Sequence, residues 1–80
     1  MTAQRTFWQA SLQTRHFSFE AFGLDEDSAR EAMLETMRVH AKSYQIDFED
    51  FVNEYRESIN VFERRTGKGY RDGEPIWAAR

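Results

Sequence analysis

The chain has 80 residues, a formal net charge of −3 and no cysteine, which excludes a disulfide framework, a thiolate metal site and a cysteine nucleophile. We expect one domain, residues 1–80, with a small core, to which the 15% of aromatic residues contribute much of the buried apolar area. The N-terminus lacks a signal-peptide pattern, and no apolar run approaches the roughly 20 residues of a membrane span, so we expect a cytoplasmic protein that contacts no membrane.

The first two predicted elements form a β-hairpin. Residues 6–13 and residues 16–22 each alternate between two faces, which is typical of half-buried strands. The apolar face of the first run consists of Trp8, Ala10 and Leu12, and one face of the second consists of Phe17, Phe19 and Ala21. Thr14-Arg15 is predicted to be a two-residue turn between the strands, and Gly23 ends the hairpin.

A long amphipathic helix is predicted from about Glu26 to Ser43. Asp25 is its expected N-cap, and Leu24 is expected to pack toward Ala29 as a hydrophobic staple. The apolar stripe has helical spacing and comprises Ala29, Met33, Met37, His40 or Ala41, and Tyr44. We therefore expect His40 to be packed in the core, whereas His16 is expected on the strand surface.

A shorter helix is predicted next, with Asp47 as its cap. Its apolar face follows the i, i+3, i+4, i+7 pattern and comprises Phe48, Phe51, Val52 and Tyr55. Residues 58–65 return to strand alternation, and turns are predicted at residues 66–69 and at Asp72-Gly73.

These elements predict an α+β fold in the order β-β-α-α-β. We expect a small antiparallel sheet with both helices packed on one face. The short segments Tyr70-Arg71 and Pro75-Ile76-Trp77 are candidates for a short fourth strand at the sheet edge.

Charge is segregated along the chain. Between Glu20 and Glu57 there are 11 acidic and four basic residues, a local charge of −7, whereas the rest has three acidic and seven basic residues, or +4. Charge asymmetry of this kind informs on partners rather than on fold. The candidate partner-binding residues form one row on each predicted helix, and they are Asp25, Asp27, Glu31, Glu35, Asp47, Asp50, Glu54 and Glu57.

Two such rows can imitate the phosphates of duplex DNA. Neighbouring side chains in a row lie about 5–6 Å apart, and each DNA strand carries one charge per roughly 3.4 Å, a difference that long carboxylate side chains can bridge. The alternative is that both rows are ordinary solvated helix faces, partly neutralised by the pairs Glu26–Arg30 and Glu35–Arg38.

The basic end of the chain is the second candidate site. Bases on either side of two glycines can hold phosphates while a tyrosine ring stacks on a base, and the residues concerned are Arg64, Arg65, Lys68, Tyr70 and Arg71. The run Gly67-Lys68-Gly69-Tyr70 resembles the start of the RNA-recognition-motif signature, but the chain departs from that signature after Tyr70. It also lacks P-loop spacing. The alternative is a solvated β-turn.

No pattern indicates catalysis. There is no Gly-x-Ser-x-Gly elbow, and the two histidines are far apart and offer no metal-ligand spacing. Phe7, Trp8, Phe17 and Phe19 could form an aromatic stacking platform on an exposed sheet face. We instead favour their packing in the core. We expect no enzyme activity, metal, cofactor or small-molecule substrate, and a homodimer is a plausible source of additional stability.

Two segments carry a resemblance to known proteins. The hairpin that runs into the first helix, residues 17–33, and the closing segment Tyr70-Arg71-Asp72-Gly73-Glu74-Pro75-Ile76 are similar in layout to small α/β proteins of phages and mobile elements. Within that group, the size and acidic helices resemble anti-CRISPR proteins that inhibit type I effector complexes. The resemblance implies a host-cytoplasmic inhibitor whose acidic surface replaces target DNA in a basic groove. The basic segment, residues 64–71, is a departure from this pattern, because a pure DNA mimic would not need it.

Overall fold

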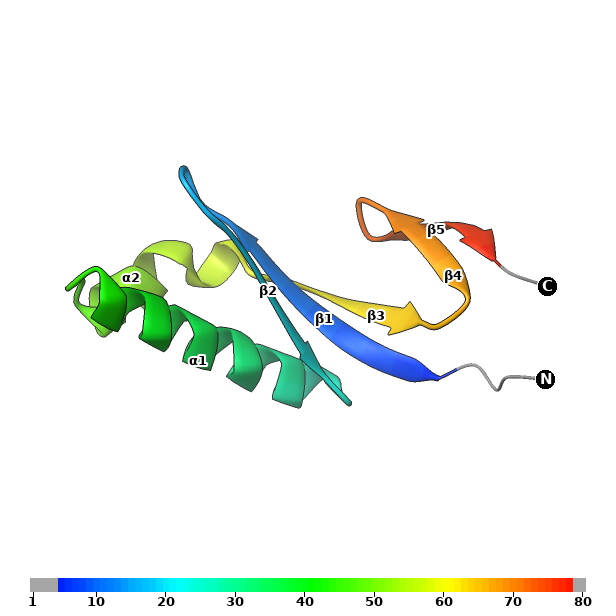
Figure 1. The fold of residues 1–80 in the computed structure, drawn as a ribbon, viewed down its shortest axis with the longest axis horizontal. Helices are drawn as coiled ribbons and strands as arrows, with labels where there is room; N and C mark the ends of the chain where they lie inside the picture. Colours follow the sequence, from blue (N-terminus) through cyan, green and yellow to red (C-terminus); the bar gives the residue numbers. More distant parts are fainter. Residues whose placement is uncertain (1–4, 79–80) are drawn as a thin grey trace.

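The computed structural model describes residues 5–78 and contains a three-stranded sheet, a pair of helices and a separate two-stranded ribbon (Figure 1). The sheet has the antiparallel order β2-β1-β3, with bounds β1 (Thr6–Gln13), β2 (Ser18–Gly23) and β3 (Asn60–Arg65). The helices are α1 (Glu26–Ser43) and α2 (Phe48–Tyr55), and a 3-10 turn, η1 (Arg56–Ser58), follows α2. The predicted α+β fold and the predicted bounds of α1 are confirmed. Residues 1–4, on which the signal-peptide expectation partly rests, lie outside the described range.

The core lies between the helices and one face of the sheet. Ala10 at the centre of β1 pairs with Ala21 of β2 and with Val61 of β3, so the three residues share the face that the helices cover. The buried residues come from both layers, and they are Ala10, Leu12, Ala21, Ala29, Met33, Met37, Ala41, Phe51 and Val52. Four of these nine are alanines, each of which buries little apolar surface.

Side-chain caps define where both helices begin. The Asp25 carboxylate accepts a hydrogen bond from the Ser28 backbone nitrogen at 2.7 Å, and the Ser28 hydroxyl accepts one from the Asp25 nitrogen at 3.1 Å. This capping box satisfies backbone donors that the first helical turn leaves without partners. Asp47 caps α2 in the same way by accepting from the Asp50 nitrogen at 2.9 Å. Both predicted caps are confirmed.

The predicted staple before α1 is wrong. Leu24 is 87% exposed, because the chain turns so tightly from β2 into α1 that Gly23 occupies the space beside Ala29. A Cβ atom on Gly23 would collide with Ser28 and with the Ala29 backbone nitrogen. Leu24 therefore points away from the core, directly before the acidic first turn of α1.

The loop between β1 and β2 is longer than predicted. It spans residues 14–17, because the Thr14 nitrogen donates to the Phe17 carbonyl oxygen at 2.8 Å and the Thr14 hydroxyl accepts from the Phe17 nitrogen at 3.0 Å. The strand β2 consequently begins at Ser18, and His16 lies exposed in the loop rather than on a strand.

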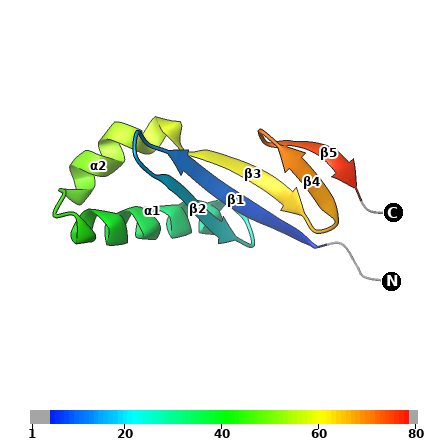
Figure 2. The same ribbon diagram turned by 45° about the horizontal axis from the view of Figure 1, so that its top comes forward.

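The last two strands pair with each other, not with the main sheet. They are β4 (Lys68–Arg71) and β5 (Glu74–Ala78), and they form an antiparallel hairpin. Asp72 and Gly73 connect them with φ angles of 51° and 84°, the left-handed values that a tight two-residue hairpin turn requires. The sequence predicted that one of these two segments could form a fourth strand at the edge of the main sheet. Instead, β4 and β5 form hydrogen bonds with each other as a separate two-stranded ribbon (Figure 2).

This ribbon makes the molecule long. Its extents are 47 × 21 × 19 Å and its radius of gyration is 14.4 Å, whereas a compact chain of this length has a radius of about 12 Å. The helices lie toward one end and the β4–β5 hairpin toward the other (Figure 1).

Candidate functional site

The predicted acidic residues of α1 are exposed, but they differ in what they contact. Asp25 serves as the N-cap, and Glu35 accepts a hydrogen bond from Arg38 at 3.3 Å in an exposed ion pair. Asp27 and Glu31 have no hydrogen-bond or ion-pair partner among residues 5–78. Because Asp27, Glu31 and Glu35 follow i, i+4 spacing, they lie along one side of the helix.

The acidic residues of α2 and η1 divide in the same way. Asp47 is occupied as the cap of α2. The side chains of Asp50, Glu54 and Glu57 are exposed and have no polar partner within the described part of the chain. Five of the eight predicted residues are therefore available for an external partner, namely Asp27, Glu31, Asp50, Glu54 and Glu57.

The hydrogen bonds at the α1 cap also act on the charge of Asp25. The backbone N–H of Ser28 lowers the pKa of the Asp25 carboxyl group below its ordinary value of 3.8, and the Ser28 side chain lowers it further. Asp25 is therefore ionised throughout the neutral range, and its negative charge lies at the positive end of the helix dipole.

The two acidic rows do not meet in a common groove. The groove between α1 and α2 is lined by Leu34, Phe48, Val52 and Ile59 together with Arg30, Arg38 and Arg56, and none of the predicted acidic residues lines it. Glu54 instead borders a hollow beside the β1–β2 loop, near Arg15 and His16. The structure thus presents two separate acidic strips rather than one continuous track.

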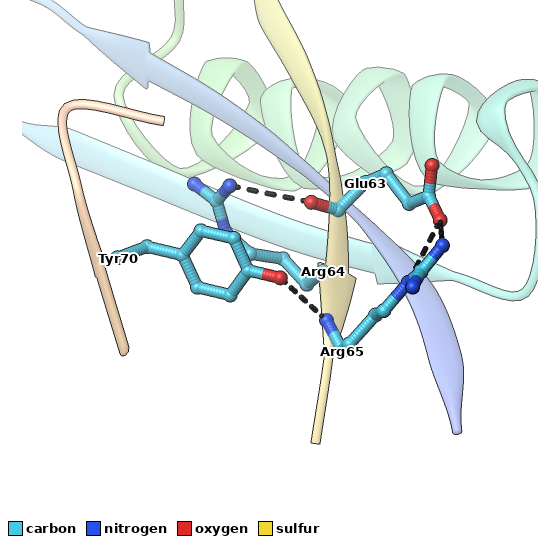
Figure 3. Close-up of polar contacts among 4 residues, drawn as sticks. All are labelled: Glu63, Arg64, Arg65 and Tyr70. Carbon is cyan, nitrogen blue, oxygen red and sulfur yellow. Dashed lines mark hydrogen bonds and ion pairs between the residues drawn. The ribbon is translucent and has the colours of Figure 1, made fainter. Parts of the chain in front are cut away.

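The predicted basic site is largely occupied by its own contacts (Figure 3). The Arg64 guanidinium lies over the Tyr70 ring at 4.4 Å. It also lies over the Phe62 ring at 4.6 Å. The Tyr70 hydroxyl oxygen accepts a hydrogen bond from the Arg65 backbone nitrogen at 2.9 Å, and Arg65 pairs with Glu63 at 3.3 Å. One face of the Tyr70 ring is therefore covered by Arg64 and cannot stack on a base.

Lys68 and Arg71 keep side chains without a polar partner within residues 5–78. The hairpin also carries an aromatic residue that the sequence interpretation did not assign to this site, Trp77, which is 63% exposed. The sequence carried a signal for it, since Pro75-Ile76-Trp77 is an apolar run that is predicted as a candidate edge strand.

His40 packs among aromatic side chains. Its ring lies 4.9 Å from Phe17, 4.9 Å from Phe19 and 4.7 Å from Tyr44, measured between centroids. The residue is half-buried and does not belong to the buried core, so the expected contacts of His40 are confirmed but its expected place in the core is not. Phe19 and Trp8 pack against the core, while Phe7 pairs with Phe22 on the opposite sheet face at 6.1 Å. The four aromatic residues weighed as a stacking platform are thus divided between different surfaces.

Within residues 5–78, no group of three or more histidine, aspartate or glutamate side chains is placed to hold a metal ion. No helix in this range is both long enough and apolar enough to cross a membrane. Neither a protein family model, nor a curated protein, nor a solved structure matches the chain.

Proposed function

We propose that the chain is a non-enzymatic inhibitor whose acidic helices occupy the basic DNA-binding groove of a protein complex. The anti-CRISPR resemblance suggests a type I CRISPR-Cas surveillance complex in the host cytoplasm as that partner. The observation that supports this proposal is the set of five exposed, unpartnered acidic residues on α1, α2 and η1.

The availability of these carboxylates is what gives the proposal its physical basis. A carboxylate without an intramolecular partner loses no existing contact when it binds an arginine or lysine of another protein. In contrast, Asp25 and Asp47 each already use one carboxylate oxygen to cap a helix. Binding through exposed charges should weaken as salt increases, because the Debye length falls to about 8 Å at physiological ionic strength.

A gel-shift titration tests this function. Labelled target duplex is titrated with the protein in the presence and absence of a purified type I surveillance complex. We expect the protein to leave free duplex unshifted and to release duplex from the complex, with less release at higher salt. A complex that keeps its DNA at saturating concentrations of a folded protein would contradict the proposal.

Two double variants with the same change in net charge identify the surface that binds the complex. The test variant is Glu31→Lys with Glu54→Lys, which reverses one unpartnered residue on each helix. The control variant is Glu20→Lys with Glu74→Lys, which changes the net charge equally at exposed positions outside the helices. We expect the test variant to lose DNA release and the control to retain it, with both folded by circular dichroism. Equal losses would assign the effect to net charge and not to the helices.

A second candidate function is nucleic-acid binding by the β4–β5 hairpin, and the exposed Trp77 favours it. Base stacking on an aromatic ring contributes about 1–3 kcal/mol per base, and Lys68 and Arg71 lie on the adjacent strand. In the same titration, a shift of free RNA or single-stranded DNA that Trp77→Ala abolishes would support this candidate.

A further inference from the structure

The groove between α1 and α2 combines an apolar floor with a basic rim. Its volume is about 380 Å³, its floor is formed by Leu34, Phe48, Val52 and Ile59, and its rim by Arg30, Arg38 and Arg56. The row Arg30, Leu34 and Arg38 follows i, i+4 spacing on α1, so the wall contributed by α1 is about 12 Å long.

The rim of this groove is basic, although the stretch of sequence that supplies its arginines is acidic. The acidic stretch from Glu20 to Glu57 has four basic residues, and the fold places three of them on this one rim. Arg56 has no polar side-chain partner within residues 5–78, and Arg38 lies over the Phe48 ring at 4.2 Å.

The ion pairs at the rim do not close the groove. Arg30 pairs with Glu26 and Arg38 pairs with Glu35, at 3.2 and 3.3 Å, but all four side chains are at least half exposed. Exposed pairs of this kind contribute little to stability, so carboxylates from another molecule can replace or join them. The chemistry that fits is a large apolar side chain for the floor, followed closely by carboxylates for the rim.

The chain carries one segment of this chemistry at its own surface. Leu24, 87% exposed, is the most exposed large apolar residue in the described range, and three acidic residues follow it: Asp25, Glu26 and Asp27. Asp27 has no partner within residues 5–78. We propose that the groove binds residues 24–27 of a second copy of this chain, with Leu24 on the apolar floor and Asp27 against the arginine rim.

A reciprocal contact of this kind would form a closed dimer, because each copy has both the groove and the segment. It would bury Leu24 and Leu34, the latter 36% exposed, and so add to a core that comprises nine buried apolar residues within residues 5–78. This inference concerns self-association and does not depend on the proposed function.

Sedimentation equilibrium across a concentration series tests the dimer. We expect concentration-dependent association of the wild type that weakens with salt. Leu24→Asp removes the apolar anchor and should weaken association by about tenfold or more. Val39→Asp is the matched control, because Val39 is also exposed, at 62%, and lies on α1 outside the groove; it should leave association unchanged.

A mixing experiment separates the contact from any effect on folding. Leu24→Asp keeps an intact groove, and Leu34→Asp keeps an intact segment, so each variant alone should associate about tenfold or more weakly than the wild type. Mixing the two restores one complete contact, so the mixture should associate more tightly than either variant alone. The proposal is overturned if the wild type is monomeric to about millimolar concentration, if the Val39 control associates as weakly as Leu24→Asp, or if the mixture associates no more tightly than the separate variants.

Discussion

The Tyr70 hydroxyl oxygen accepts a hydrogen bond from the Arg65 backbone nitrogen at 2.9 Å, and this bond links the β4–β5 hairpin to the end of β3. A two-stranded hairpin alone is marginally stable in water. The position of this hairpin therefore depends on a few contacts with β3, which include this hydrogen bond, the Arg64 guanidinium over the Phe62 and Tyr70 rings, and the close approach of Gly73 to the Phe62 ring.

Tyr70→Phe removes this link while keeping the ring. The Arg65 amide then loses its acceptor, and we expect its hydrogen exchange to accelerate. The melting temperature should change little, since a hydrogen bond contributes about 0.5–1.5 kcal/mol and this one is exposed. Amide exchange followed by NMR measures the effect, with the exposed Tyr44→Phe as control. Unchanged protection of the Arg65 amide would show that the bond does not form in solution.

Gly73→Ala should displace the hairpin turn from β3. An added Cβ atom would lie 2.5 Å from the Phe62 Cε1 atom, and the φ angle of +84° is unfavourable for alanine. We expect nuclear Overhauser contacts between residue 73 and the Phe62 ring to disappear. Gly69→Ala is the control, because its Cβ atom would meet Trp77 at an ordinary 3.5 Å. Loss of the Phe62 contacts in both variants would indicate a hairpin that is unstable irrespective of Gly73.

Met33→Ala should unfold much of the population at room temperature. Met33 is 0% exposed in the centre of the core, and truncation of a buried methionine costs about 2–5 kcal/mol. A domain of this size generally has only about 3–5 kcal/mol of stability. Urea titration followed by circular dichroism provides the measurement. Val39→Ala, at a 62% exposed position, should lie within about 0.5 kcal/mol of the wild type.

The lowered pKa of Asp25 predicts a loss of stability in acid. Its folded pKa lies below the unfolded value of about 3.8, so the contribution of its charge is present above that pH. The contribution is lost as the pH falls through the folded pKa. Asp25→Asn keeps an oxygen that can cap α1 but does not titrate. Thermal melts between about pH 2 and pH 5 should therefore show a weaker pH dependence for Asp25→Asn. Parallel curves for the two proteins would contradict this assignment.

The local elements were predictable because their signals are local. Helical spacing of Ala29, Met33 and Met37, together with the Asp25 cap, gave the bounds of α1, and strand alternation placed Ala10 and Leu12 in the core. The exposure of the acidic rows followed from the same periodicity. These predictions required only the geometry of a single helix or strand.

Features that depend on contacts between elements were not predictable in the same way. The partner of β4 could not be chosen from the sequence, because two four- to five-residue strands can pair with each other or with a sheet edge. The spacing of Arg30 and Arg38 puts both on one side of α1, but the sequence does not tell that Arg56 lies across from them. Leu24 was misplaced because the close approach of Gly23 to Ser28 depends on how the chain turns from β2 into α1, which the periodicity of neither element reveals.

The elongated shape gives the segregated charges a further consequence. The helices, with their excess of carboxylates, lie toward one end of a 47 Å molecule, and the basic segment of residues 64–71 lies toward the other (Figure 1). Such a molecule is an electric dipole, and it experiences a torque in the field of a charged surface before any atoms touch. A cationic partner would therefore meet the helical end first, so that productive collisions become more frequent without any additional contact in the final complex.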